Sequence, residues 1–242
     1  MTRVALVTGG TRGIGAAIAK GLAAAGHKVA ATYAGNKEKA DAFKKETGIS
    51  VYQWDVGDTS ACNEGVKRVE GEVGPVDILV NNAGITRDGW FHKMDFPAWS
   101  AVLRTNLDSM FAMTRPVIEG MRDRNFGRII NISSINGQKG QLGQVNYSTA
   151  KAGVIGFTKA LALENARKGI TVNCVCPGYI DTDMVAAVSE KALEGIVAAI
   201  PVGRLGRAEE ISELVVYLAS DSSAFMTGAV LSINGGQYMA NG

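Results

Sequence analysis

The chain has 242 residues, of which 46% are hydrophobic and 20% charged, as is typical of a globular protein with a sizeable core. Its formal net charge of +2 is too small to indicate binding to nucleic acid or to a membrane surface. No window approaches the ~18 apolar residues of a membrane helix, and the N-terminus does not resemble a secretion signal, so we expect a cytoplasmic protein.

Short apolar runs alternate with helical patterns along the whole chain. The predicted strands are 3–8, 28–33, 49–55, 76–82, 127–134, 170–176 and 229–235. The predicted helices are 13–26, 36–47, 59–73, 95–124, 147–168 and 208–220. Runs that are nearly continuous in Val, Ile, Leu and Ala are typical of strands buried on both faces. The pattern predicts an α/β fold of Rossmann type, a three-layer sandwich with a seven-stranded parallel sheet covered by helices on both faces.

We expect residues 1–242 to form one domain, because no linker or repeat divides the chain. Residues 178–207 interrupt the alternation and contain a helical pattern that ends at Pro201. A long connection after a strand is a typical place for a lid over a substrate, so we predict a lid insertion here.

The three cysteines indicate a reducing compartment rather than a disulfide framework. Cys174 and Cys176 alternate on one face of a predicted strand and are interpreted as small core residues. No histidine lies near them in the sequence, so we predict no metal site.

The first predicted strand runs into TGGTRGIG, in which Gly9, Gly13 and Gly15 precede a helix. Glycines allow a sharp turn and a close approach to a pyrophosphate, which the helix N-terminus then binds. A tight turn without a ligand would need the same residues. Its place after the first strand of a parallel sheet favours a dinucleotide site.

The end of the second predicted strand favours NADP(H) over NAD(H). An NAD site usually has an acid there for the ribose 2′-hydroxyl, but no carboxylate appears before Glu38. Arg12, within the glycine turn, is available for a 2′-phosphate. Tyr33 is predicted to line the adenosine site, and Lys37 is either a solvated charge or a second phosphate contact.

Y-x-x-x-K occurs twice in the chain, as Tyr33…Lys37 and as Tyr147…Lys151. Gly35 and Asn36 interrupt the first copy, whereas the second lies on a predicted helix, where positions i and i+4 share a face. Ser134 ends the fifth predicted strand, thirteen residues before Tyr147.

These residues predict a carbonyl reduction site. Tyr147 would protonate the carbonyl oxygen if a nearby Lys151 charge lowered its pKa, and Ser134 would hold that oxygen by a hydrogen bond. Asn106, inside the helix predicted at 95–124, is either a solvated residue or part of this site.

The chain resembles the short-chain dehydrogenase/reductases over essentially its whole length. The shared motifs are TGGTRGIG, NNAG at 81–84, Asn106, Ser134, Tyr147-x-x-x-Lys151 and Pro177-Gly178. The resemblance implies a catalytic set of Asn106, Ser134, Tyr147 and Lys151, with Asn106 holding a relay water, and a homotetramer packed through the long helices. The cofactor-binding residues assigned in this way are Gly9, Thr11, Arg12, Gly13, Ile14, Gly15, Tyr33, Asp55, Val56, Asn82, Ala83, Gly84, Tyr147, Lys151, Pro177, Gly178 and Ile180.

Within that family, SINGQKGQLGQVNYSTAKAG resembles the acetoacetyl-CoA reductases of polyhydroxybutyrate synthesis. This implies NADPH-dependent reduction of acetoacetyl-CoA to (R)-3-hydroxybutanoyl-CoA. The substrate contacts it implies are Asp88, Ser134, Gln141, Leu142, Gly143, Gln144, Gly178 and Tyr179. For the loop at 141–144, a plain polar loop is the other interpretation.

Two alternative functions remain open at this stage. A 3-oxoacyl-[acyl-carrier-protein] reductase has the same chemistry, but its protein-borne substrate needs a basic docking patch near the cleft. Arg122, Arg124 and Arg128 are the candidates for that patch. A non-catalytic NADP sensor is the remote alternative, and such a protein would not need Tyr147 and Lys151.

Overall fold

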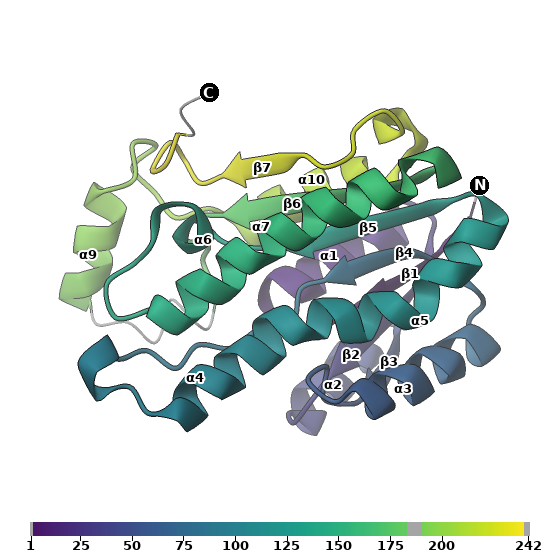
Figure 1. The fold of residues 1–242 in the computed structure, drawn as a ribbon, viewed down its shortest axis with the longest axis horizontal. Helices are drawn as coiled ribbons and strands as arrows, with labels where there is room; N and C mark the ends of the chain where they lie inside the picture. Colours follow the sequence, from purple (N-terminus) through teal and green to yellow (C-terminus); the bar gives the residue numbers. More distant parts are fainter. Residues whose placement is uncertain (1, 183–189, 240–242) are drawn as a thin grey trace.

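The computed structural model describes residues 2–182 and 190–239 and places seven parallel strands in one sheet. The strands are β1 (Val4–Val7), β2 (Lys28–Tyr33), β3 (Ser50–Gln53), β4 (Val76–Asn81), β5 (Gly127–Ile132), β6 (Ile170–Pro177) and β7 (Val230–Ile233). Their order in the sheet is β3-β2-β1-β4-β5-β6-β7 (Figure 1). All seven were predicted, and the boundaries agree to within a few residues.

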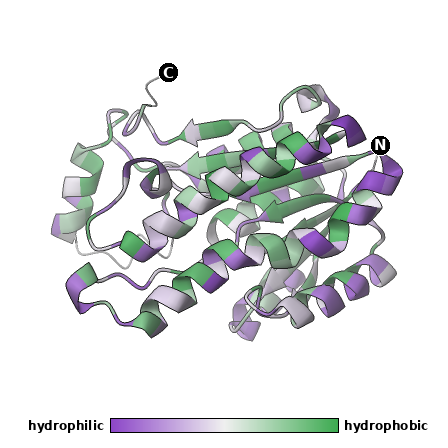
Figure 2. Ribbon diagram, in the orientation of Figure 1, coloured by the Kyte–Doolittle hydropathy of each residue, from purple (hydrophilic) through white to green (hydrophobic). Residues whose placement is uncertain are grey.

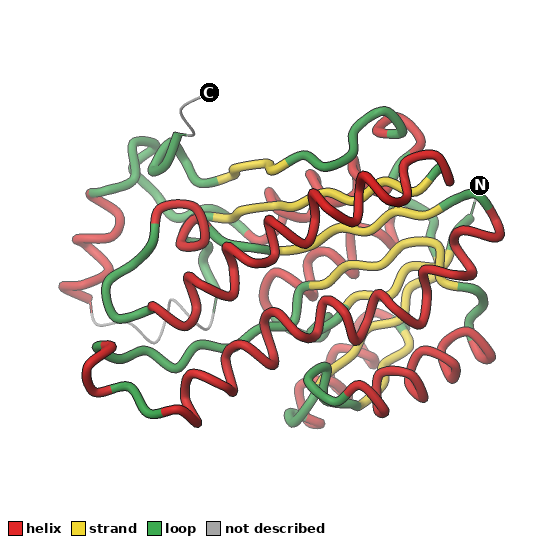
Figure 3. Tube along the Cα trace, viewed as in Figure 1, coloured by secondary structure: helices red, strands yellow, loops and turns green. Residues whose placement is uncertain are grey.

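Helices cover both faces of this sheet, as Figure 3 shows in red and yellow. The α-helices are α1 (Gly13–Ala24), α2 (Lys37–Thr47), α3 (Thr59–Glu72), α4 (Phe96–Leu103), α5 (Ser109–Arg124), α6 (Ile135–Lys139), α7 (Val145–Asn165), α9 (Glu190–Ala198) and α10 (Ala208–Ala219). Short 3-10 turns are η1 (Phe91–Lys93), η3 (Ala166–Lys168) and η4 (Asp221–Ser223). The predicted α/β fold class is confirmed.

Side-chain alternation along the strands creates two cores, one on each face of the sheet. In β1, Leu6 points to a cluster formed with α3, α5 and α7. Its neighbours Ala5 and Val7 point to a cluster formed with α1, α2 and α10. In Figure 2 the strands are mostly hydrophobic, whereas α3 alternates hydrophobic and hydrophilic residues, as expected for a helix on the surface of a sheet.

The helix predicted at 95–124 is interrupted. Between α4 and α5 the chain makes a π-helical turn, η2 (Arg104–Asp108), which contains Asn106. Such wide turns are rare in proteins and are frequently found at functional sites. The helix predicted at 147–168 begins earlier, at Val145, and its last residues form η3. The short helix α6 was not predicted.

The insertion predicted at 178–207 is only partly described, because residues 183–189 lie outside the described residues. Its later part contains α9, where a helical pattern was expected. Backbone hydrogen bonds join the two ends of the insertion to each other: Gly206 N donates to Tyr179 O at 2.9 Å, and Asp181 N donates to Gly206 O at 2.8 Å.

Candidate active site

The glycine turn after β1 folds back tightly on itself. Gly9 and Gly13 have positive φ angles of 61° and 51°, a backbone region that favours glycine. At Gly15 the constraint is space, because a Cβ there would collide with the Gly9 carbonyl oxygen and lie 2.5 Å from Asn82 Nδ2. The turn therefore brings backbone N–H groups close to the surface, where a phosphate can reach them.

Helix α1 begins without a side-chain cap, since the residue at its N-cap, Arg12, makes no capping hydrogen bond. Within residues 2–182 and 190–239, side chains cap four other α-helices, namely those of Asn36, Asp58, Asp95 and Ser134. The first N–H groups of an α-helix lack intrahelical partners and carry a partial positive charge. Together with the exposed Arg12, this N-terminus fits the phosphates of a dinucleotide.

The end of β4 is fastened to the glycine turn. Asn82 Nδ2 donates to Thr8 O at 2.9 Å and to Gly9 O at 3.3 Å. Thr8 Oγ1 in turn accepts from the backbone N–H groups of Asn82 and Ala83 at 2.9 and 3.0 Å. The Asn82 side chain thus positions the turn, and Ala83 and Gly84 follow it along the same edge of the sheet.

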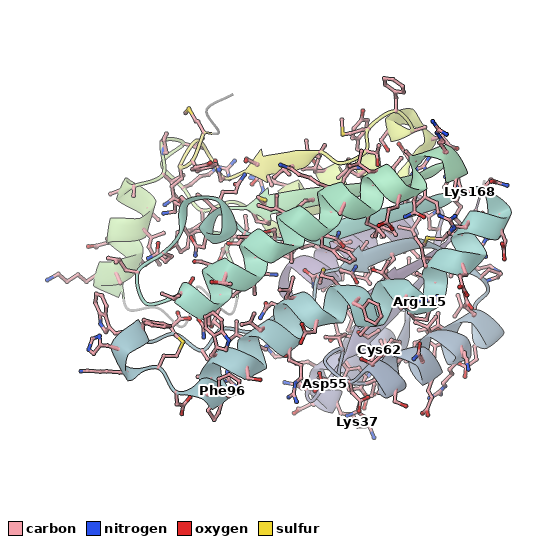
Figure 4. The ribbon with its side chains drawn as sticks, viewed as in Figure 1. Lys37, Asp55, Cys62, Phe96, Arg115 and Lys168 are labelled. Carbon is pink, nitrogen blue, oxygen red and sulfur yellow. The ribbon has the colours of Figure 1, made fainter. Side chains whose placement is uncertain are left out.

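The ends of β2 and β3 lie beside each other, as predicted. Trp54 N donates to Tyr33 O at 3.1 Å. Asp55 Oδ1 accepts from Gly57 N at 2.8 Å, which shapes the turn after Val56. Lys37, labelled with Asp55 in Figure 4, is exposed at the first position of α2, so it does not share a helix face with Tyr33.

The two serines at the end of β5 have different partners. Ser133 Oγ donates to the Lys151 carbonyl oxygen at 2.7 Å, which ties β5 to α7. Ser134 Oγ accepts from Asn136 N at 3.1 Å and caps α6. The Ser133 hydroxyl proton is therefore committed to the fold, whereas that of Ser134 is available to a substrate.

Tyr147 and Lys151 lie on one face of α7, with Lys151 Nζ 5.6 Å from the centroid of the Tyr147 ring. Lys151 is buried, and its Nζ donates to Ile132 O at 2.9 Å. A Cβ placed on Gly84 would lie 3.6 Å from that Nζ and 2.5 Å from Asn106 Oδ1. The fold thus gathers Asn106, Tyr147 and Lys151 around the end of β4.

Asn106 is fully buried in the π-helical turn rather than solvated. Its Nδ2 donates to Val102 O, the acceptor that a backbone N–H at this position uses in an α-helix, and to Ile85 O, both at 2.9 Å. Its Oδ1 is buried without a partner among the described residues. An unpaired buried carbonyl oxygen is costly, so we interpret it as an acceptor kept for the reaction.

Burial shifts the two ionisable groups in opposite directions. It raises the pKa of Tyr147 to about 12, an effect that the Ser134 hydroxyl opposes and the Asp88 carboxylate reinforces. It also lowers the pKa of Lys151 to about 8. The lowering of the Tyr147 pKa predicted from the sequence is therefore not found in the protein alone. Tyr147 carries its proton at neutral pH, as a proton donor must.

The predicted substrate residues come from two loops that are hydrogen-bonded to each other. Gln144 Nε2 donates to Asp88 Oδ2, and Gly89 N donates to Gly143 O, both at 2.8 Å. Leu142, the residue before Gly143, is exposed. This pairing forms a rim immediately before Tyr147, whose helix begins at Val145.

The predicted residues after β6 lie on the other side of the rim. Gly178 N donates to Ile233 O at 2.9 Å, which joins the end of β6 to β7. Burial raises the pKa of the Tyr179 hydroxyl, and the Asp88 carboxylate adds to this effect. Ile180 is buried. A cavity of about 150 Å³ lies here, lined by Tyr179, Ile180, Ile200, Val202, Arg204, Gly206, Glu210, Ile211, Ile233, Asn234 and Gly235.

Two buried asparagines beside the site were not predicted. Asn146 Nδ2 donates to Arg87 O at 2.9 Å, and its Oδ1 accepts from Tyr147 N at 2.8 Å, so it joins the rim to the start of α7. Asn136 joins Ser134 to Gln144. The available signal was NYSTAK and SSIN, in which an amide side chain stands beside each predicted catalytic residue.

The basic docking patch considered for a carrier protein is not near the cleft. Arg122, Arg124 and Arg128 lie at the end of α5 and the start of β5, the amino edge of the sheet. Arg122 donates to Asn165 Oδ1, Arg124 to Val76 O and Asp77 Oδ1, and Arg128 is buried. These candidates do not lie beside Tyr147, because residues that precede a strand lie at the edge opposite to the site.

Cys174 and Cys176 are buried in the core on one face of β6, with their sulfur atoms 3.9 Å apart. Among residues 2–182 and 190–239, no group of three or more His, Cys, Asp or Glu side chains is placed to hold a metal ion. None of the helices in these ranges combines the length and apolar character needed to span a bilayer.

A family model described as enoyl-(acyl carrier protein) reductase matches residues 9–237. An acetoacetyl-CoA reductase of Rhizobium meliloti is 66% identical over 99% of this chain and 100% of its own length. An acetoacetyl-CoA reductase of Shinella zoogloeoides is 64% identical over 98% of this chain and 99% of its own. The 3-oxoacyl-[acyl-carrier-protein] reductase FabG of Escherichia coli is 47% identical over 98% of both chains.

Proposed function

Since the chain belongs to the short-chain dehydrogenase/reductases, oxidoreductases that use a nicotinamide cofactor, we propose that it reduces acetoacetyl-CoA to (R)-3-hydroxybutanoyl-CoA with NADPH. The observation that carries the reaction type is the gathering of Asn106, Tyr147 and Lys151 beside the uncapped N-terminus of α1. A site with a proton donor, a buried cation and a phosphate-binding turn is suited to carbonyl reduction.

NADPH supplies the hydride that the ketone carbon receives. Tyr147 holds the proton for the carbonyl oxygen, because its raised pKa keeps it protonated at neutral pH. The Lys151 ammonium, with a pKa of about 8, is largely protonated at that pH and stabilises the tyrosinate that remains. The product then has one new C–H bond from the hydride and one O–H bond from Tyr147.

Ser134 and Asn106 assist this transfer in different ways. Ser134 Oγ accepts the N–H of Asn136, so its own proton is free to donate to the substrate carbonyl. The unpaired Oδ1 of Asn106 lies near Gly84, as does Lys151 Nζ. This oxygen accepts a hydrogen bond from the relay that returns a proton to Tyr147.

We assign the cofactor as NADP(H) on the basis of Arg12 and the end of β2. Arg12 is exposed beside the glycine turn, and no carboxylate of β2 is available for a ribose 2′-hydroxyl. A guanidinium there favours a 2′-phosphate.

The choice of a CoA thioester over a carrier-protein thioester has two supports. The relatives that are 64% and 66% identical bear the name acetoacetyl-CoA reductase, whereas the 3-oxoacyl-[acyl-carrier-protein] reductase is 47% identical. The arginines considered for docking a carrier protein lie at the far edge of the sheet and are already hydrogen-bonded.

Steady-state kinetics with acetoacetyl-CoA and with an acetoacetyl carrier-protein thioester test this proposal, each with NADPH and with NADH. We expect a higher kcat/KM for the CoA thioester and for NADPH. Equal or better turnover of the carrier-protein thioester would refute the CoA assignment.

We also propose that the chain assembles as a homotetramer through its long helices. Phe111 on α5 and Leu163 on α7 are large apolar residues with exposed fractions of 59% and 85%. Exposed apolar residues of this size on two neighbouring helices indicate an interface. Light scattering after size exclusion measures the mass, and a monomer would contradict the proposal.

A further inference from the structure

A line of hydrogen bonds runs from the substrate rim to the oxygen of Ser134. It begins at Asp88 Oδ2, which accepts from Gln144 Nε2 at 2.8 Å. Gln144 Oε1 accepts from Asn136 Nδ2 at 2.9 Å. Asn136 N then donates to Ser134 Oγ at 3.1 Å. Asn136 therefore contacts both sides, through its side chain toward the rim and through its backbone toward Ser134.

The short helix that carries Asn136 is held against α7 at the catalytic turn. A Cβ on Gly137 would lie 2.6 Å from the Lys151 carbonyl carbon, so the two backbones approach as closely as glycine allows. Gly137 N also donates to Ser134 O at 3.0 Å. A five-residue helix has little stability of its own, so its position depends on such contacts.

The contact to Asn136 determines what the Ser134 hydroxyl can do. A serine hydroxyl has one proton to donate and lone pairs that accept. Because the Asn136 backbone N–H donates to this oxygen, the hydroxyl proton is free to point away from α6. If α6 shifted, the Ser134 oxygen would lose the hydrogen bond from Asn136 N–H, and its side chain could rotate away from the substrate.

We propose that Asn136 is a positioning residue, which holds the Ser134 hydroxyl ready to donate to the substrate and links it to the rim at Gln144 and Asp88. This rests on the proposed function, since donation of the Ser134 hydroxyl proton matters only for carbonyl reduction. Asn136 is 8% exposed and touches no reacting atom itself. Its side chain bonds to Gln144 and its backbone N–H to Ser134, so loss of the side-chain bond acts on Ser134 through the position of α6.

The test is a double-mutant cycle of Asn136→Ala and Ser134→Ala, assayed by steady-state kinetics with NADPH. We expect Asn136→Ala to lower kcat by about tenfold, with KM changed less than about twofold, the size expected for one misaligned hydrogen bond. In the Ser134→Ala background the same change has no further effect, because the group it positions is gone.

Gln138→Ala is the matched control. Gln138 lies on the same short helix, but its side chain bonds to Ser232 Oγ and not to the rim. We expect it to leave kcat within about twofold of wild type, while melting temperature and NADPH binding, followed by fluorescence, match those of Asn136→Ala. A similar loss of kcat in Gln138→Ala would mean that any damage to α6 suffices and would overturn the inference.

Two results separate this inference from the proposed function. If Ser134→Ala is impaired and Asn136→Ala costs the same factor in that background, the positioning role is refuted while the proposed reaction stands. If Ser134→Ala retains wild-type kcat, the proposed mechanism fails and the inference fails with it. The cycle is repeated with the N-acetylcysteamine thioester of acetoacetate, so that its result does not depend on CoA being the natural carrier.

Discussion

The two edges of the sheet use polar residues in different ways. At the amino edge, Arg3 and Arg128 stack on the Phe126 ring with guanidinium carbons 3.6 and 4.4 Å from its centroid. Arg3 also pairs with Asp221 at 2.7 Å, and Arg128 donates to the carbonyl oxygens of Gly127, Gly169 and Ser220. These cations have partners within the protein.

At the carboxyl edge, polar groups are left open. The N-terminus of α1 is uncapped, and the buried oxygens Asn106 Oδ1 and Asn136 Oδ1 have no partner among the described residues. Among the described residues, the buried Lys151 ammonium donates to the Ile132 carbonyl oxygen and pairs with no carboxylate. Groups satisfied within the protein stabilise the fold, whereas groups left open are available for a ligand and cost stability. Substitutions at the amino edge should therefore destabilise the fold and spare catalysis. Substitutions at the carboxyl edge should impair catalysis and can stabilise the fold.

The largest expected effect is the loss of catalysis in Tyr147→Phe. This change removes only the hydroxyl, so we expect kcat with acetoacetyl-CoA to fall by about 10³-fold, within the usual range for a general acid. Tyr33→Phe, in the other Y-x-x-x-K copy, is the matched control: it keeps the ring that lines the adenosine site, so kcat at saturating NADPH should stay within about twofold of wild type. Wild-type kcat in Tyr147→Phe would show that another group donates the proton.

The second prediction concerns stability at the amino edge. Arg128 is 3% exposed, so Arg128→Ala removes hydrogen bonds to three carbonyl oxygens and the packing of the guanidinium on Phe126. We expect the free energy of unfolding to fall by about 3 kcal/mol, measured by urea denaturation, with kcat of the folded enzyme unchanged.

The control for this prediction is Arg115→Ala. Arg115, labelled on α5 in Figure 4, is exposed and pairs with Glu119 one helical turn away, so its loss should cost less than about 0.5 kcal/mol. A lower kcat for the folded fraction of Arg128→Ala would contradict the separation of the two edges.

The same contrast explains what the sequence could predict. Strands β1, β4, β5 and β6 were found because short, nearly continuous apolar runs are typical of buried strands. The glycine turn and Tyr147…Lys151 were found because their chemistry requires particular residues at particular spacings. These features depend on local sequence, and their positions relative to the strands followed from the alternation of elements.

Other features depend on contacts that no local pattern records. The π-helical turn at Asn106 has the same apolar periodicity as the α-helices around it, so a single helix was predicted. Helix α6 is too short to show a period, and the bond between Asn136 and Gln144 spans eight residues across two helices. The sequence could have placed the arginines considered for docking at the edge opposite to the site, because Arg122 and Arg124 precede the fifth strand.

The third prediction is that Lys151→Met abolishes turnover but stabilises the fold at neutral pH. Burial lowers the Lys151 pKa from 10.5 to about 8, which corresponds to a cost of about 3 kcal/mol for the charged form. Removing the charge recovers this cost, less about 1 kcal/mol for the lost hydrogen bond to Ile132 O. The net gain at pH 7 should be about 2 kcal/mol.

That gain should disappear as the pH rises. Between pH 8 and 10.5 the unfolded wild-type chain binds more protons than the folded chain, so the stability of the wild type increases with pH. Lys151→Met has no titrating group at this position, so its stability lacks this increase. The two proteins are compared by urea denaturation at pH 7, 9 and 10.5. A stability difference that stays constant across this range would show that Lys151 is not destabilised by burial.

The smallest effect is expected for Arg12→Ala, which tests whether the open N-terminus of α1 distinguishes between cofactors. The α1 N–H groups and glycine turn serve both NADPH and NADH, so only the 2′-phosphate distinguishes them at this residue. Losing one charge-assisted hydrogen bond should lower kcat/KM for NADPH about tenfold and leave NADH within about twofold. Lys37→Ala, the other cation considered for this phosphate, is the matched control, and we expect a smaller loss because Lys37 begins α2 as an exposed side chain. Equal losses with NADPH and NADH in Arg12→Ala would mean that Arg12 supports the turn itself, and the preference for NADPH would then have to arise elsewhere along the carboxyl edge.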